Sequence, residues 1–490
     1  MPDPYRRSPR PASSRCAREQ NGSELVKLAI LGGGGFRVPM VYQALLADTG
    51  PLRDTEVVLY DCDPQRLTVM ESVLARLAER SLDAPRVTAT DDLDAALEGA
   101  DFVFSAIRVG GLAGRERDER IALDLGVLGQ ETTGPGGIAF GLRTIPVALH
   151  IAERVRRLCP GAYVINFTNP AGMITEAMQR VLGDRVIGIC DTPSGLGRRI
   201  TAALGLDPAE TRLDYVGLNH LGWLRGVISG GADRLPGLLA DDDKLATLEE
   251  TDIFGADWIR TLGCIPNEYL YYYYFNRDAI AAIAAQDAPR GAFLTRQQNG
   301  FYGAAAAAPQ RALELWEQTH AERRSLYMAE ARSGSQGEPR AGRERVPGAD
   351  GQHGAGQQPG GDGEPVQATD GGYSGVALGV MRAIGGGEPA TMILNVRNGN
   401  VLAGLDADAV VEVPTVVDSS GVHPLPAAAP DMSQLGLMQQ VKAVERLTIE
   451  AATTGSADAV LKAFALHPLV DSVSVARRLT DAYAVAMETR

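Results

Sequence analysis

Three short apolar runs in the middle of the chain each end in polar residues that could bind a ligand. The runs and their polar ends are 163–165 with Asn166 and Asn169, 186–189 with Cys190 and Asp191, and 214–218 with Asn219 and His220. In open α/β sheets, ligands bind at the carboxyl ends of strands, so three such ends predict one rim of one site. A thiol and an imidazole at that rim could hold a divalent metal ion. Taken singly, Cys190 would be a buried structural thiol and His220 a core histidine.

A glycine-rich turn follows the first predicted strand. Residues 26–31 have the pattern of a buried strand, residues 40–46 that of a helix, and between them stand Gly32, Gly33, Gly34 and Gly35. Such a turn lets backbone N–H groups and the helix dipole approach a pyrophosphate. The next predicted strand, 57–60, runs into Asp61, which could accept hydrogen bonds from a ribose diol. The order predicts a dinucleotide site, although the third glycine of the usual motif is absent and the spacing to the acid is long.

Helices and strands continue to alternate after this turn. The pattern predicts a helix over 64–80, a strand over 86–89, a helix over 93–97 and a strand over 101–107. This alternation predicts an α/β fold with a Rossmann-like, doubly wound parallel sheet. After residue 223 the alternation loosens, so we expect a second α/β (α+β) domain. We predict a dinucleotide-binding domain over 25–195 and a C-terminal catalytic and oligomerisation domain over 196–490.

Two segments are poor in the large apolar residues that a packed core needs. Residues 1–24 are polar and rich in proline, and residues 333–372 consist mainly of Gly, Gln, Pro, Glu, Arg and Asp. We expect a disordered leader and a low-complexity insertion within the second domain. The sequence leaves open whether the leader is translated. The leader has no apolar h-region, so it does not resemble a secretory signal.

The overall composition excludes several classes of function. A formal net charge of −14 argues against non-specific binding to nucleic acid or to an anionic membrane. No apolar run approaches the roughly 18 to 20 residues of a membrane-spanning helix. The five cysteines are odd in number and irregularly spaced, which favours a reducing cytoplasm over a disulfide scaffold.

Further polar residues surround the predicted rim. Arg108 after the fourth strand could bind a phosphate or carboxylate, whereas Arg115 taken alone is more typical of a solvated surface residue. Residues 129–137 could form a loop that closes over a ligand, or an ordinary connection to a helix over 143–158. Tyrosines crowd residues 267–275, where most would be core, but one phenol could act as a base.

These motifs together resemble one enzyme family. They are Gly32 to Gly35, Tyr60-Asp61, 129–137, 166–170, 190–193, 217–222, 267–273 and 445–450. In order and combination they resemble the NAD- and manganese-dependent glycoside hydrolases of family 4, and within that family the 6-phospho-β-glucosidases. The resemblance implies a cytoplasmic enzyme that forms a homodimer or homotetramer and acts on phosphorylated glycosides.

The resemblance also implies a reaction that differs from hydrolysis by paired carboxylates. NAD would oxidise C3 of the sugar, a base would remove the acidified C2 proton, and a metal would stabilise the enediolate. The aglycone would leave by elimination, water would add, and the hydride would return.

Roles follow by position from the resemblance. Cys190 and His220 match the metal ligands, Tyr269 the C2 base with Tyr272 as the fallback, and Gly32 to Gly35 with Asp61 the NAD site. Phosphate recognition would fall to Arg108, Asn169 and Arg290. Asp191 matches the general acid of relatives that act on α-linked sugars, which leaves the preferred anomer open between 6-phospho-β-glucosides and α-glucosides or α-galactosides.

The same fold would also suit two functions of a different class. One is an NAD-dependent sugar or hydroxy-acid dehydrogenase, which would need neither Tyr269 nor the Cys190 and His220 pair. The other is a non-catalytic NAD sensor, which the chemically competent residues at all of these positions disfavour.

Overall fold

The computed structural model describes residues 25–50, 52–286, 288–325 and 372–488. The predicted leader, and the predicted insertion up to residue 371, lie outside the described residues. Six strands come from the first part of the chain: β1 (Val26–Leu31), β2 (Thr55–Tyr60), β3 (Arg86–Thr90), β4 (Phe102–Ser105), β5 (Tyr163–Asn166) and β6 (Val186–Gly188). The later strands are β7 (Thr211–Leu218), β8 (Leu221–Ser229), β9 (Ala232–Asp233), β10 (Ile265–Pro266), β11 (Ala390–Arg397), β12 (Val410–Asp418) and β13 (Gly421–Pro424).

All of these strands belong to one continuous sheet. Its order is β10-β8-β7-β12-β11-β6-β5-β4-β1-β2-β3, with β13 beside β12 and β9 beside β8. The strands β1 to β6 are parallel to their neighbours among themselves. Their order, 3-2-1-4-5-6, is that of the Rossmann fold. The predicted α/β class and doubly wound parallel sheet are therefore confirmed.

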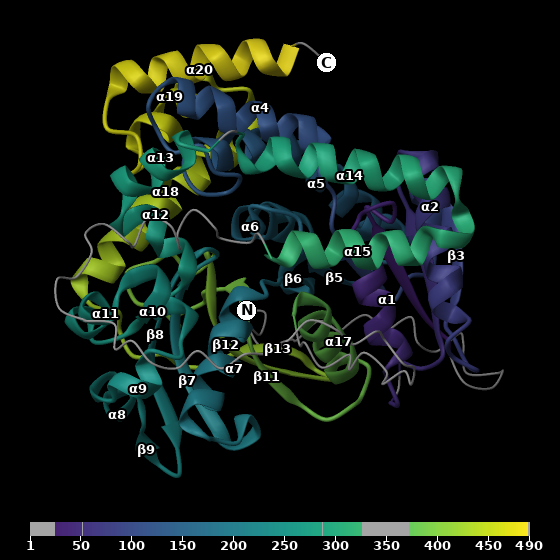
Figure 1. Cartoon of the computed structure of the whole chain (residues 1–490), viewed down its shortest axis with the longest axis horizontal. Helices are drawn as coiled ribbons and strands as arrows, with labels where there is room; N and C mark the ends of the chain where they lie inside the picture. Colours follow the sequence, from purple (N-terminus) through teal and green to yellow (C-terminus); the bar gives the residue numbers. More distant parts are fainter. Residues whose placement is uncertain (1–24, 51, 287, 326–371, 489–490) are drawn as a thin grey trace, which may run out of the picture.

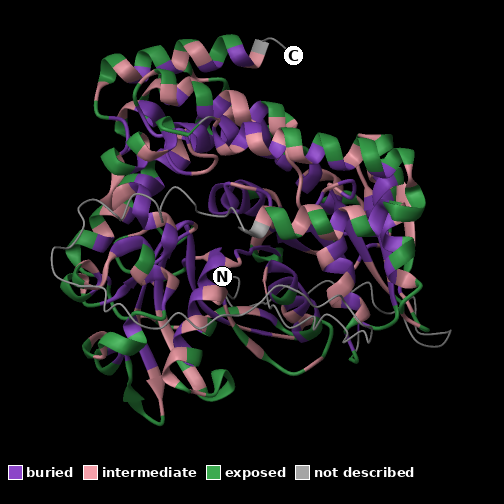
Figure 2. Ribbon diagram, in the orientation of Figure 1, coloured by how far each residue is buried: buried purple, intermediate pink, exposed green. Residues whose placement is uncertain are grey.

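Helices cover both faces of the parallel strands (Figure 1). Side chains alternate along β1, so Leu28 and Ile30 join one apolar core while Ala29 and Leu31 join another on the opposite face. Helices α1 (Val38–Leu46) and α2 (Pro64–Ala78) line the first core. Helices α3 (Leu93–Leu97), α5 (Pro135–Leu158) and α6 (Ala171–Leu182) line the second. Buried residues accordingly run along the strands in Figure 2.

Helix α5 begins at Pro135, so the predicted start at residue 143 was wrong. Gly136 and Gly137, which were predicted to lie in a loop, form part of the first turn of the helix instead. A Cβ at Gly136 would lie 2.1 Å from the carbonyl oxygen of Gln130, and one at Gly137 would lie 2.1 Å from that of Thr132. The residues 129–134 therefore fold tightly over the start of α5, and this contact excludes larger side chains.

The remaining strands extend the sheet in an antiparallel manner. Strand β11 pairs with β6 through Asn395 and Gly188, and β12 pairs with β7 through Glu412 and Gly217. The place of the third apolar run on the predicted rim implied a parallel strand, but this run is antiparallel to its neighbours. It is β7, the first strand of a hairpin with β8 whose turn contains Asn219 and His220. So short a connection can only join antiparallel strands.

The other helices surround the extended sheet. Helices α14 (Arg290–Ala307) and α15 (Ala312–Ser325) cross the molecule in Figure 1, and α17 (Tyr373–Ile384) follows the residues that are not described. The last three, drawn in yellow-green and yellow, are α18 (Met432–Thr454), α19 (Ala457–Leu466) and α20 (Val473–Glu488). The rest are α4 (Gly111–Asp124), α7 (Thr192–Leu204), α8 (Leu235–Ala240), α9 (Asp242–Leu245), α10 (Glu249–Phe254), α11 (Ala256–Leu262), α12 (Tyr271–Tyr274) and α13 (Asn276–Ala284), with short 3-10 turns between them. Among the described residues, none of these helices is long and apolar enough to span a bilayer.

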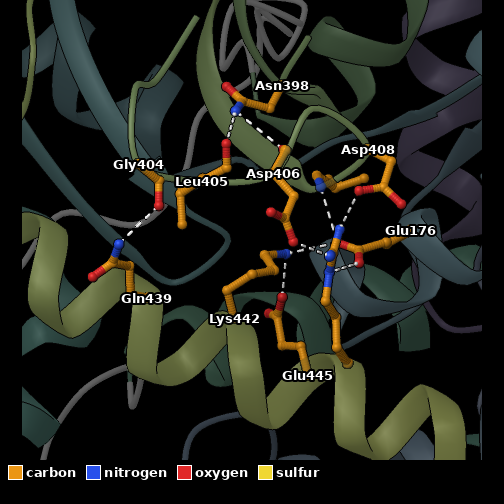
Figure 3. A network of polar contacts seen from close by, with 11 residues as sticks. Glu176, Asn398, Gly404, Leu405, Asp406, Asp408, Gln439, Lys442 and Glu445 are labelled. Carbon is orange, nitrogen blue, oxygen red and sulfur yellow. Dashed lines mark hydrogen bonds and ion pairs between the residues drawn. The ribbon is translucent and has the colours of Figure 1, made fainter. Parts of the chain in front are cut away.

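A buried ionic network fastens α18 to α6 (Figure 3). The Glu176 carboxylate accepts hydrogen bonds from Lys442 Nζ at 2.9 Å and Arg446 Nε at 2.8 Å, and also from the backbone N–H of Val410. Lys442 also pairs with Glu445 one helical turn further along α18. Lys442, Glu176 and Glu445 are buried, so removing one partner would leave an uncompensated charge.

Candidate active site

A cavity of about 400 Å³ lies where the glycine turn, the ends of β4 to β6 and the β7–β8 hairpin meet. It collects most of the residues that the sequence predicted. Those that line it are Gly32, Gly35, Arg108, Asn169, Cys190, Asp191, His220, Tyr269 and Arg290. Tyr272, the alternative base, lines the cavity as well, whereas Gly33, Gly34 and Asp61 do not.

The glycine turn is shaped by close contact with neighbouring strands. Gly32 has φ +84°, and a Cβ there would lie 2.6 Å from the carbonyl oxygen of Ala106. The backbone N–H of Gly34 donates to Asp61 Oδ2 at 3.0 Å. This bond ties the acid after β2 to the turn after β1, beside the start of α1. Backbone N–H groups at the start of a helix are suited to bind an anion.

Cys190 follows β6 and is almost fully buried. Burial and the nearby charges of Glu412 and Asp191 raise the pKa of its thiol well above the ordinary value. The thiol is therefore protonated at neutral pH unless a cation lies next to it. A divalent metal ion would displace this proton and bind the thiolate.

His220 lies in the hairpin turn with φ 63°, and among the described residues no other non-glycine has a positive φ. Burial lowers the pKa of its imidazole to about 4, so the ring is neutral at neutral pH. The Thr132 hydroxyl donates to Gln130 Oε1 at 3.2 Å and lies 2.8 Å from His220 Nδ1. The Thr132 hydroxyl thus holds Nδ1 and leaves Nε2 as the ring nitrogen that is available to bind a metal ion. A neutral imidazole with its other nitrogen held by a hydrogen bond is the usual metal-binding form.

The two donors do not form a closed metal site. Within the residues that the structure describes, no three His, Cys, Asp or Glu side chains gather closely enough to hold an ion. Cys190 and His220 both line the cavity, and a metal ion held by them would take its further ligands from substrate or water. The donor chemistry fits a divalent metal ion bound together with a substrate.

Tyr269 lies opposite His220 in a short 3-10 turn, Glu268–Leu270. Its ring is stacked on the imidazole, with centroids 3.7 Å apart and planes 1° from parallel. The Asn267 side chain accepts a hydrogen bond from the backbone N–H of Tyr269 at 3.0 Å and so fixes the turn. Tyr272 lies further along, with its ring centroid 6.1 Å from that of Tyr269.

Arg115 is not the solvated surface residue that the sequence predicted. Its side chain is 10% exposed and pairs with Glu119 and Glu131, each at 2.7 Å. Burial alone would lower the pKa of Arg115, but Glu131 and Glu119 raise it, with a smaller contribution from Tyr269. The sequence around Arg115 has no feature that indicates which face of α4 lines the cavity.

Several arginines give the cavity a positive wall. Those that line it are Arg37, Arg66, Arg108, Arg115, Arg290 and Arg323. Burial, and then repulsion by Arg37, Arg115, Arg108 and Arg290, lowers the pKa of Arg323 to about 9. Despite its burial, Glu131 has a pKa lowered to about 2 by Arg108, Arg115 and Arg323. The sequence analysis missed Arg323, because its charged neighbours in α15 are typical of a solvated helix face. The arrangement is suited to bind an anion.

Comparison with known proteins agrees with this geometry. The family model described as family 4 glycosyl hydrolase matches residues 27–206, and that of the family 4 C-terminal domain matches residues 215–470. The chain belongs to family 4 of the glycoside hydrolases. The two models meet between residues 206 and 215, whereas the boundary predicted at 195/196 stays a prediction.

This family 4 hydrolase is similar over most of its length to 6-phosphoglucosidases. A probable 6-phospho-β-glucosidase of Bacillus subtilis is 30% identical over 93% of this chain and 95% of its own length. A 6-phospho-α-glucosidase of Leptotrichia buccalis is 27% identical over 93% and 96%. The structure of the Thermotoga maritima 6-phospho-β-glucosidase with manganese, NAD⁺ and glucose 6-phosphate has a TM-score of 0.75 at 28% identity, covering 94% of this chain and 98% of that one.

Proposed function

We propose that this family 4 hydrolase cleaves 6-phospho-β-glucosides, using NAD and a divalent metal ion, with manganese as the expected metal. The observation that carries the proposal is the meeting of four groups in one cavity. These are the glycine turn, the Cys190 and His220 pair, the phenol of Tyr269 and the arginine wall. A relative with the same fold binds manganese, NAD⁺ and glucose 6-phosphate.

NAD bound there would supply reversible hydride transfer at C3 of the sugar, and a divalent metal ion would supply Lewis-acid polarisation. Gly32 to Gly35 and Asp61 would hold the dinucleotide, and Cys190 Sγ with His220 Nε2 would hold the metal. Arg108, Asn169 and Arg290 would orient the sugar through its phosphate, and Arg323 would add charge to the same wall.

Two side chains would carry out the proton transfers. Tyr269 would take the C2 proton, because its ring is stacked on the imidazole of His220 and its phenol interacts electrostatically with the guanidinium of Arg115. Asp191 would protonate the departing aglycone oxygen.

The second candidate is a 6-phospho-α-glucosidase. It is supported by the carboxylate of Asp191 in the cavity, the position of the general acid in relatives that act on α-linked sugars. Competing cleavage of the two aryl 6-phosphoglucoside anomers distinguishes the candidates by their kcat/KM ratio. The homodimer or homotetramer and the cytoplasmic location also stay predictions.

NMR of the sugar product tests the proposed chemistry. An aryl 6-phospho-β-glucoside is supplied in D2O with NAD⁺, Mn²⁺ and a reductant. We expect deuterium at C2 of the released glucose 6-phosphate, because a deuteron from the solvent replaces the proton that Tyr269 removes. Cleavage without deuterium would indicate direct displacement, and accumulation of NADH without cleavage would indicate a dehydrogenase.

A further inference from the structure

A buried carboxylate lies behind the wall of the cavity. Glu412 of β12 has no exposed surface, and it does not line the cavity. Its Oε1 accepts hydrogen bonds from Asn395 Nδ2 at 2.8 Å and Asn219 Nδ2 at 3.5 Å, and its Oε2 accepts one from the Tyr215 hydroxyl at 3.0 Å. In the described part of the chain, no lysine or arginine pairs with it. Such a group needs its hydrogen bonds to remain buried.

The bond from Tyr215 leads to the proposed base. The Tyr215 hydroxyl accepts a hydrogen bond from Asn267 Nδ2 at 3.1 Å, so its own proton is directed at Glu412. Asn267 Oδ1 in turn accepts from the backbone N–H of Tyr269. The turn that carries Tyr269 is therefore connected to Glu412 by an unbroken chain of hydrogen bonds.

The bond from Asn219 leads to the hairpin turn and the start of α6. Asn219 precedes His220, and its Oδ1 accepts a hydrogen bond from the backbone N–H of Ala171 at 3.1 Å. Ala171 follows the Asn169-Pro170 segment at the cavity. One side chain thus joins the turn of His220 to the segment of Asn169.

The bond from Asn395 leads to the strand that carries the thiol. Asn395 is the residue of β11 that pairs with Gly188 of β6, two residues before Cys190. A Cβ at Gly188 would lie 2.7 Å from the Cβ of Asn395, so the two strands touch without intervening side chains.

We propose that Glu412 is a positioning residue that holds the segments of Cys190, His220 and Tyr269 in register with one another. All three donors bind it at once, which requires two acceptor oxygens on one side chain. A glutamine at this place would offer one acceptor and an amide N–H₂ group that faces other donors. The inference rests on the proposed function only in that these three residues are taken to be catalytic or metal-binding.

The test compares Glu412→Gln with Glu176→Gln. Both glutamates are buried, and Glu176 accepts a hydrogen bond from the backbone of β12, the strand that carries Glu412, but Glu176 belongs to the ionic network of Figure 3. Cobalt(II) titration reports the metal site without turnover, through the thiolate-to-cobalt charge-transfer band. We expect Glu412→Gln to weaken cobalt binding roughly 10- to 100-fold, the usual effect of losing a group that orients metal ligands. Glu176→Gln should lower the thermal midpoint and leave cobalt binding within about twofold.

Hydrogen–deuterium exchange provides a readout that depends on neither metal nor activity. Exchange of peptides covering residues 217–222 and 266–270 should be faster in Glu412→Gln and unchanged in Glu176→Gln. Unchanged exchange together with unchanged cobalt affinity would overturn the proposal, as would an equal effect of Glu176→Gln on both. If the wild type neither cleaves 6-phosphoglycosides nor shows the cobalt band, the proposed function fails, and the exchange data alone then decide the role of Glu412.

A milder variant guards against misfolding of Glu412→Gln. Tyr215→Phe keeps the buried ring and removes only the hydroxyl that links Glu412 to Asn267. We expect kcat to fall about 10-fold or more with KM and cobalt affinity nearly unchanged, since only the turn of Tyr269 is released. Wild-type kcat in a folded Tyr215→Phe protein would contradict the connection.

Discussion

The imidazole of His220 lies flat against the phenol ring of Tyr269, with ring centroids 3.7 Å apart and ring planes 1° from parallel. The two residues come from different segments, a hairpin turn and a 3-10 turn. Both residues line the cavity. A proton acceptor and a proposed metal ligand are thereby held at a fixed separation.

Tyr269→Phe tests the role of the phenol. The substitution keeps the stacked ring and removes the proton acceptor, so we expect kcat/KM to fall by roughly 10²- to 10⁴-fold. NAD binding and the thermal midpoint should stay near the wild-type values. Steady-state kinetics and deuterium incorporation at C2 provide the measurement. The matched control is Tyr272→Phe, and a larger loss there than in Tyr269→Phe would reassign the base to Tyr272.

Cys190→Ser tests the metal site. A hydroxyl binds a divalent metal ion less well than a thiolate, so we expect weaker cobalt(II) and manganese binding, loss of the charge-transfer band and loss of turnover. NAD binding, followed by fluorescence, should remain nearly intact. Cys159→Ser changes another buried thiol that does not line the cavity and should retain the metal affinity. Unchanged turnover in Cys190→Ser would exclude this thiol as a ligand.

Arg323→Met tests the arginine wall. Loss of a charged hydrogen bond costs about 1.5 to 3 kcal/mol, so we expect glucose 6-phosphate to inhibit roughly 10- to 100-fold more weakly. Calorimetry with glucose 6-phosphate and, separately, with glucose measures the contribution of the phosphate. Arg311→Met removes an arginine paired with Glu314 at the surface and should bind as the wild type does. An equal loss for glucose and glucose 6-phosphate would mean that Arg323 does not act on the phosphate.

His467 predicts how stability depends on pH. Burial lowers the pKa of this imidazole from 6.5 to about 3. Between pH 6.5 and about 3 the unfolded chain therefore binds a proton at this histidine that the folded chain does not bind. The contribution of His467 to the free energy of unfolding is fully present above pH 6.5 and is lost as the pH decreases toward 3. One such group contributes a slope of about 1.4 kcal/mol per pH unit.

His467→Asn should reduce this dependence. The asparagine can still accept the hydrogen bond that Leu469 N–H donates to Nδ1 of the imidazole, but it cannot be protonated. Thermal midpoints at pH 7, 6 and 5 measure the effect, and the fall on acidification should be smaller in the variant. His150→Asn, which replaces an exposed histidine of α5, serves as the control. Equal slopes in the two variants would refute the prediction.

Local patterns predicted the parallel half of the fold well. Strand Val26–Leu31 and helix Leu93–Leu97 have the predicted bounds, because a continuous apolar run and a capping aspartate are properties of neighbouring residues. The start of α5 was missed for the opposite reason. Gly136 and Gly137 look like loop residues in the sequence, and only the folded loop over them explains why they are helical.

The sequence by itself determined the alternation of strands and helices and the short segments at which chemistry could occur, since Gly32 to Gly35, Cys190 and His220 stand at the ends of apolar runs. The tertiary structure alone decided that Arg115 and Arg323 are half-buried in the cavity wall and that β7 pairs antiparallel in the same sheet. It also decided that Glu412, 222 positions after Cys190 in the numbering, lies behind the site. Such contacts depend on the packing of segments far apart along the chain, which no local periodicity records.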